Sequence, residues 1–131
     1  MLKNKAFTLI EILIVVAIVA ILATLVAPSV IRSRITTNET LAQAHLNTIA
    51  TAIENYSMAH NGYPNAVTLL TSGTPPYLNN DFFASPRDGY QFTATVLNTG
   101  GYAILAAPVN NTTDGHTSFT ISTGFLLRAN P

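Results

Sequence analysis

The sequence predicts an α+β protein in which a long N-terminal helix packs against a small antiparallel sheet of about four strands. Residues 7–27 form an almost unbroken apolar run. Beyond that run, apolar residues recur in steps of three and four, which is typical of an amphipathic helix. After residue 90, apolar and polar residues alternate, which is typical of strands. The 131 residues leave room for one small domain beyond the apolar segment.

The first predicted element is a membrane-spanning helix over residues 7–28. From Phe7 to Ala27, 18 of 21 residues are apolar and Glu11 is the only charged one. A helix of this length spans about 30 Å, the thickness of the hydrocarbon core of a bilayer. A carboxylate inside a membrane is costly unless it is paired, so Glu11 is expected to need a cationic partner. The alternative is that Glu11, near the helix start, only reaches back to the membrane surface.

The second predicted element is an amphipathic helix over residues 29–61, which continues the first. Pro28 lacks an amide hydrogen and is expected to kink the helix where the two segments join. The helix is expected to end near Asn61, with Gly62 supplying the left-handed cap. The following Tyr63-Pro64 prevents further helix.

The remaining residues predict a connecting loop and then a sheet. Residues 62–89 are rich in proline and glycine and read as a loop with a short helical turn at 65–71. Residues 90–131 read as two hairpins that cover the exposed half of the helix. The expected core comprises Leu46, Ile49 and Ile53 of the helix, and Tyr90, Phe92, Ile104, Phe119, Ile121 and either Phe125 or Leu127 of the sheet.

Composition restricts the possible functions. The chain has no cysteine, so the domain must be held by its core, by packing on its own helix or by neighbouring subunits. Residues 7–131 carry six acids against four arginines, a net charge of −2, and no basic patch argues for nucleic acid. No catalytic constellation is evident, so we expect a protein that is not an enzyme and that has no cofactor.

No metal site is expected either. The three histidines lack the spacing of a metal site, and we interpret them as structural or solvated. Three loop acids are better explained by turn formation than by calcium binding, which remains an alternative. These six residues are His45, His60, His116, Asp81, Asp88 and Asp114.

The start of the chain resembles a known family. Lys-Ala-Phe-Thr-Leu-Ile-Glu at residues 5–11 is similar to the class III signal of type IV pilins and of type II secretion pseudopilins, usually Gly-Phe-Thr-Leu-Ile-Glu. The resemblance covers roughly residues 5–35 and includes the basic leader, with Lys3 and Lys5, and Pro28. Ala6 stands where the family has glycine.

The resemblance implies a processing step and a pilin-like fold. A prepilin peptidase would cut between Ala6 and Phe7, remove residues 1–6 as a leader, and methylate the new Phe7 amine. Residues 7–28 would serve as membrane anchor and then as filament core, and residues 29–131 would form the globular pilin domain. The Phe7 ammonium would lie one helical turn from Glu11, on the same or a neighbouring subunit, and the pair would fix the register of assembly.

The implied function is a structural subunit of a type IV pilus-like extracellular filament, assembled through the N-terminal helix. Its expected partners are copies of itself, the prepilin peptidase and the inner-membrane assembly machinery. The precursor would reside in the inner membrane and the mature subunit in a cell-surface or extracellular filament. The alternatives are a pseudopilin of type II secretion and, from another class, a single-pass anchored binding domain.

Overall fold

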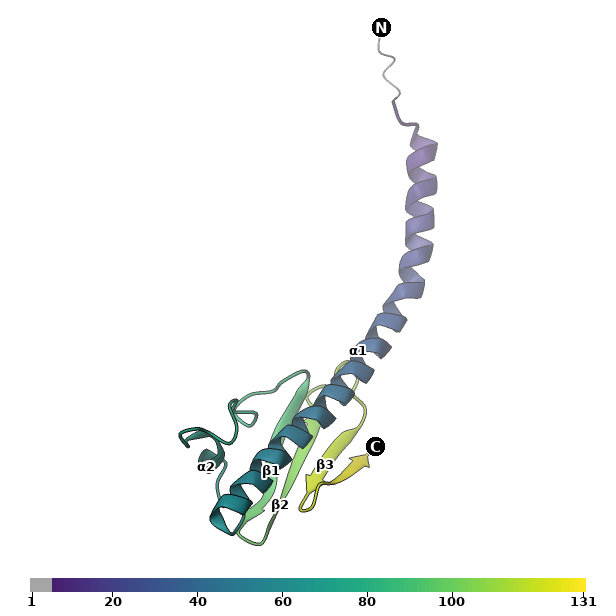
Figure 1. Cartoon of the computed structure of the whole chain (residues 1–131). Helices are drawn as coiled ribbons and strands as arrows, with labels where there is room; N and C mark the ends of the chain where they lie inside the picture. The colour runs from purple at the N-terminus through teal and green to yellow at the C-terminus, as the bar shows by residue number, and fades with distance from the viewer. Residues whose placement is uncertain (1–5) are drawn as a thin grey trace. The chain divides into compact units, whose positions relative to one another are not determined.

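The computed structural model describes residues 6–131, and the predicted leader charges Lys3 and Lys5 lie outside the described residues. The chain divides into two compact units, Met1–Ser33 and Arg34–Pro131. Helix α1, Leu9–His60, contributes to both units (Figure 1). Pro28 lies inside α1, with helix on both sides of it, and its effect on helix direction stays a prediction.

The C-terminal end of α1 differs from the prediction in one residue. Asn61, not Gly62, takes the left-handed conformation, with a φ of 54°. Asparagine tolerates this region better than most residues. The Gly62 amide then donates to the Ser57 carbonyl at 3.3 Å, which closes the helix with a Schellman bond. The prediction that Gly62 is the left-handed cap was therefore wrong.

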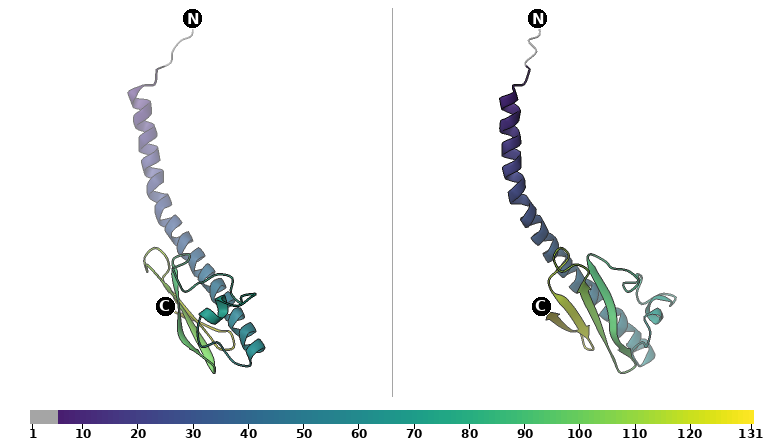
Figure 2. Two further views of the ribbon diagram at one scale, coloured as in Figure 1. Left: turned by 90° about the vertical axis from the view of Figure 1, so that its left-hand side faces the viewer. Right: turned by 180° about the vertical axis from the view of Figure 1, so that it is seen from behind.

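The sheet has four antiparallel strands in the order in which they occur along the chain, β1-β2-β3-β4. Residues 61–89 form a loop that contains the short helix α2, Thr68–Thr71. The four strands are β1 Tyr90–Asn98, β2 Gly101–Pro108, β3 Ser118–Ser122 and β4 Leu126–Asn130. They lie against the C-terminal part of α1 (Figures 1 and 2). The predicted fold class, a long helix on a four-stranded antiparallel sheet, is confirmed.

The core lies between the sheet and residues 42–53 of α1. Leu46, Ile49 and Ile53 are fully buried, as predicted. The five predicted core residues of β1, β2 and β3 are also buried: Tyr90, Phe92, Ile104, Phe119 and Ile121.

The prediction that Phe125 or Leu127 completes the core was wrong. Leu127 lies opposite Ile121 in the register, so it belongs to the same face of the sheet. It nevertheless stays 36% exposed, because β4 is the edge strand. Phe125 is 47% exposed and lies in the turn before β4 at a φ of 60°. The helix covers the middle of the sheet and leaves this edge open.

A single carboxylate ties four parts of the domain together. Glu54 of α1 accepts hydrogen bonds from the Tyr63 hydroxyl at 3.2 Å and from the Tyr102 hydroxyl at 3.0 Å. Its Oε1 also accepts from the Gly124 amide at 3.4 Å. The helix, the segment after it, β2 and the β3–β4 turn therefore converge on Glu54. Burial and the Glu54 charge raise the pKa of Tyr102 above its ordinary value.

Tyr90 anchors the other end of the sheet. Its hydroxyl donates to the Thr117 carbonyl at 2.8 Å, and a Cβ on Gly115 would collide with that hydroxyl. Burial, with the charges of Glu39 and Asp114, raises the pKa of Tyr90 to about 12.

We expect the domain to lose stability as the pH rises from about 10, the ordinary tyrosine pKa, to about 12. The folded state holds the Tyr90 proton more tightly than the unfolded state, so the stabilisation is complete below about pH 10 and is lost as the pH rises through about 12. Thermal unfolding as a function of pH measures the effect. In Tyr90→Phe the unfolding temperature should fall less steeply with pH than in the wild type. It should still fall, because Tyr63 and Tyr102 also have raised pKa values. An unchanged slope would contradict the assignment.

Candidate assembly site in the N-terminal helix

The start of α1 is closed by a reciprocal pair of side chains. The Thr8 amide and hydroxyl both donate to Glu11 Oε2, at 2.8 and 2.9 Å. The Glu11 amide donates in return to Thr8 Oγ1 at 3.3 Å. Thr8 precedes the first helical residue, so the two residues form a capping box, Thr-x-x-Glu.

The capping box changes the interpretation of Glu11. Within the described residues its carboxylate contacts Thr8, and the cationic partner expected from the sequence stays a prediction. The expected cation, the Phe7 ammonium, exists only after cleavage. The sequence reasoning missed the role of Thr8, although Thr-x-x-Glu before an apolar run is a readable signal.

The predicted cleavage site lies just before the helix. Ala6 and Phe7 are exposed and precede the first residue of α1, and the Phe7 side chain is 82% exposed. A peptidase that must bind an extended backbone would find this bond outside regular helix. The geometry therefore allows cleavage between Ala6 and Phe7 without unwinding α1.

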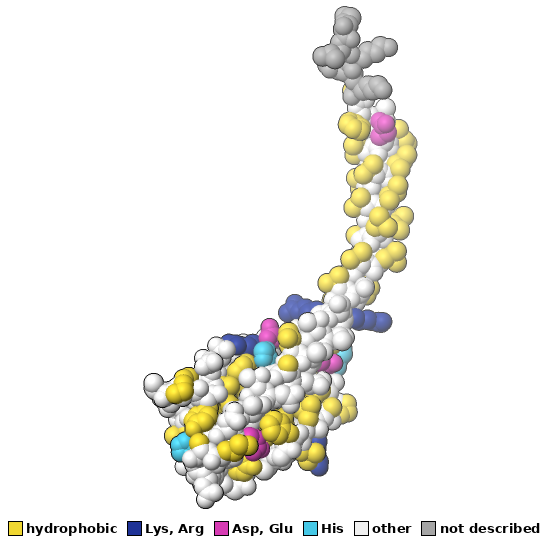
Figure 3. Space-filling model, viewed as in Figure 1, with side chains coloured by type: hydrophobic (Ala, Val, Ile, Leu, Met, Phe, Trp, Pro, Cys, Tyr) yellow, Lys and Arg dark blue, Asp and Glu magenta, His cyan; other side chains and the backbone are white. Residues whose placement is uncertain are grey.

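The first half of α1 presents a continuous row of apolar side chains on the face that Figure 3 shows. From Leu9 to Ile31 its large apolar residues are all between 45 and 79% exposed. By length and composition α1 can cross a membrane. A helix that is apolar all round is stable in lipid or buried among other helices. This surface therefore requires a bilayer or other helices around it.

The loop acids singled out in the sequence have protein partners. The Asp88 carboxylate lies 2.8 Å from Nε2 of His45. The His45 ring also packs against the ring of Phe82. Asp114 pairs with Arg34 at 3.1 Å. These contacts tie loops to α1.

Asp81 and His116 each take part in a hydrogen bond between a side chain and a backbone amide. Asp81 Oδ1 accepts from the amides of Phe83 and Ala84 at 2.9 and 3.2 Å, as a turn-forming aspartate does. The His116 amide donates to Glu39 at 3.0 Å. Among the described residues, no group of three or more His, Asp or Glu side chains could hold a metal ion.

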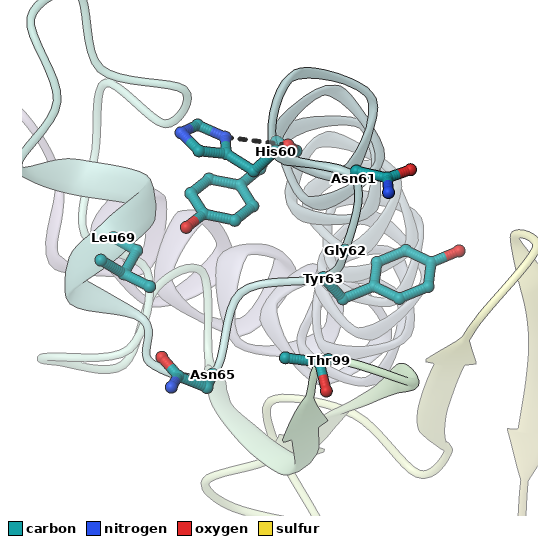
Figure 4. A pocket seen from close by; sticks show the side chains of 8 residues that line it. His60, Asn61, Gly62, Tyr63, Asn65, Leu69 and Thr99 are labelled. Atoms are coloured by element: carbon teal, nitrogen blue, oxygen red, sulfur yellow. Dashed lines mark hydrogen bonds between the residues drawn. The ribbon is translucent and has the colours of Figure 1, made fainter.

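A small cavity of about 260 Å³ lies where α1 ends. Figure 4 shows His60, Asn65, Leu69 and Thr99 around it. His60 stacks on Tyr56 with ring centroids 4.1 Å apart, and its Nδ1 lies 3.1 Å from the Tyr56 carbonyl. Since a carbonyl only accepts, Nδ1 carries the proton. The predicted structural role of His60 fits this contact.

The fold and the N-terminal site together define a class: a protein with one exposed apolar helix that continues into a small helix-on-sheet domain. Comparison with known proteins gives the family. Residues 1–27 match the model of the prokaryotic N-terminal methylation motif. The chain is 35% identical over 107 residues to the type IV wide pilus major component PilA4 of Thermus thermophilus, covering 79% of this chain and 80% of that protein.

Two further relatives are type II secretion system core proteins G. The protein of Pseudomonas aeruginosa is 38% identical over 94 residues, and that of Pectobacterium carotovorum is 28% identical over 89 residues. The matches cover 63% and 57% of those two proteins, and 67% of this chain in each case. The chain belongs to the type IV pilin and pseudopilin family.

Proposed function

We propose that this chain is a structural subunit of a type IV pilus-like extracellular filament, assembled through its N-terminal helix. The observation that carries the proposal is the exposed apolar first half of α1, which begins at the Thr8–Glu11 capping box within the methylation motif. Covering a large apolar side chain contributes about 1.5 to 3 kcal/mol, so a helix with this many exposed ones associates strongly once it leaves lipid.

The proposed pathway begins in the inner membrane. There the prepilin peptidase removes residues 1–6 and methylates the Phe7 amine, and assembly machinery moves the subunit into the filament. Lipid covers residues 7–28 in the precursor, and the helices of other copies cover them in the filament. The Phe7 ammonium and the carboxylate of Glu11 then pair within or between subunits and set the offset between neighbouring helices.

A pseudopilin of type II secretion is the second candidate, because two of the relatives are proteins of that system. The coverage of the matches favours the pilus. The chain spans 80% of the wide-pilus component but only 57% and 63% of the two secretion proteins. Electron microscopy of cells that express the chain, with mass spectrometry of the sheared material, tests the choice. Long surface filaments made of this subunit support the pilus. If no filaments form, and cells without the subunit fail to secrete proteins, the pseudopilin is supported.

We expect the filament subunit to begin at Phe7 and to carry a methylated amine. The Ala6–Phe7 bond lies outside α1, and the motif match includes it. The intact mass of the subunit from sheared filaments shows where the mature chain begins and whether it is methylated. Ala6→Gly should raise the processing rate, because glycine is the usual residue before the cut in this family. A subunit that retains residues 1–6 would contradict the prediction.

A further inference from the structure

Four asparagines of the chain stand two residues before a serine or a threonine. This arrangement, Asn-x-Ser/Thr, is the acceptor pattern for N-linked glycans. The four residues are Asn38, Asn55, Asn110 and Asn111. So short a pattern recurs by chance in a chain rich in asparagine and threonine, and it selects none of the four by itself. The structure separates them, because their surroundings differ.

Two of the four asparagines lie within α1 and are unsuited to modification. Asn38 is only 8% exposed, and its Nδ2, the atom that would carry the sugar, donates to the Asp114 carbonyl at 3.0 Å. Asn55 is exposed, but side chains two positions apart on a helix do not face each other. The Ser57 hydroxyl donates instead to the Glu54 carbonyl at 2.9 Å.

The other two asparagines lie in the loop between β2 and β3. Asn110 Oδ1 accepts a hydrogen bond from the Thr112 amide at 2.9 Å and another from the Thr112 hydroxyl at 2.7 Å. Asn110 and Thr112 are both exposed. The equivalent threonine of Asn111 is engaged elsewhere, because the Thr113 hydroxyl donates to Asp114 Oδ1 at 3.4 Å. Asn110 alone of the four combines an exposed side chain with contact to its own threonine.

The two hydrogen bonds alter the chemistry of the Asn110 amide. An amide nitrogen is a weak nucleophile, because its electron pair is shared with the carbonyl. Donors on the oxygen draw electron density toward it, so a proton on the nitrogen becomes easier to remove. Both bonds engage Oδ1 and not Nδ2, the atom to which a glycan is attached. The turn therefore favours reaction at the nitrogen.

The end of the same loop is fixed to α1. Asp114 pairs with Arg34 at 3.1 Å, and Glu39 accepts a hydrogen bond from the His116 amide at 3.0 Å. The Asp114 amide also donates to the carbonyl of Asn110 at 2.9 Å, which closes the turn. Asn110 is thus held at a defined place on the surface, outside the core. A large group attached there displaces no buried side chain.

We propose that Asn110 is the acceptor of an N-linked glycan, transferred by a membrane-bound oligosaccharyltransferase to the exported domain. The donor is an oligosaccharide carried on a lipid pyrophosphate. Nδ2 forms a bond to C1 of the first sugar while the bond from C1 to the pyrophosphate oxygen breaks. The lipid pyrophosphate leaves with the bonding electrons, and Nδ2 gives one proton to a base of the transferase. The reaction requires export of the domain but not its assembly into a filament.

Intact mass and peptide mapping of the full chain, isolated from the membranes of its own cells, test the proposal. The wild-type subunit should carry an added sugar mass on the peptide that contains Asn110. Asn110→Gln and Thr112→Val should abolish the added mass. Thr112→Ser keeps both donors to Asn110 Oδ1 and should retain it. Asn55→Gln and Thr113→Val are matched controls, since each removes another acceptor pattern, and both should keep the wild-type mass.

Two results would overturn the proposal. One is a wild-type subunit without an added sugar mass, and the other is a sugar mass that persists in Asn110→Gln. Filament yield is a separate readout on the same cells. Filaments of unmodified subunit would overturn this inference alone. A modified subunit in the membrane, in cells that make no filaments, would support this inference and contradict the proposed function.

Discussion

Ile53→Ala is expected to lower the free energy of unfolding of the domain by about 2 to 5 kcal/mol. Ile53 is fully buried and belongs to the α1 face under the sheet. Truncating it removes apolar contacts and leaves a cavity. The total free energy of unfolding of a domain of this size is about 5 to 15 kcal/mol. No disulfide compensates for the loss.

Thermal unfolding of the full chain in detergent measures the effect. Met58→Ala is the control, because Met58 lies on the same helix but is 80% exposed, and its unfolding temperature should stay near the wild-type value. An Ile53→Ala shift as small as that of the control would mean that the core does not depend on this helix face.

Glu11→Ala is expected to leave the protein in the membrane and to remove most of its filament assembly. Loss of a charge eases insertion by about 2.5 kcal/mol or more on insertion scales. The same change deletes the carboxylate that we propose sets the register between subunits. Blots of membrane fractions and of sheared filaments separate the two effects.

Two further variants separate the charge of Glu11 from its capping role. Glu11→Gln keeps an oxygen that can accept from Thr8 but removes the charge, so it should assemble as poorly as Glu11→Ala. Thr8→Ala removes the hydroxyl of the capping box and keeps the charge, so it should assemble better than either. Normal filament yield in Glu11→Gln would show that capping, and not the charge, is the function of Glu11.

The helix and the hairpins could be predicted because their signals are local. The steps of three and four that place Leu46, Ile49 and Ile53 on one face are visible in the sequence, and so is the alternation in residues 90–131. The error at Leu127 has a different origin. Its position in the alternation is right, but whether α1 reaches β4 depends on how far the sheet extends past the helix, which no local pattern states.

The site was predictable in part for the same reason. The motif around Glu11 and the capping pattern at Thr8 are both contiguous in sequence, although only the first was recognised. The convergence of Tyr63 and Tyr102 on Glu54 joins residues up to 48 positions apart.

The Thr8–Glu11 capping box has a consequence for the electrical state of the anchor. The three hydrogen bonds of the box involve only atoms of Thr8 and Glu11, and both residues lie after the Ala6–Phe7 bond. Proteolysis at that bond would therefore leave the helix end intact while it creates an ammonium group beside it. The anchor would change from a monoanion to a zwitterion with no change in backbone conformation. A net neutral, dipolar helix start costs less to move through hydrocarbon than an anionic one, so the cut would lower the electrostatic cost of carrying this end of the helix across the membrane.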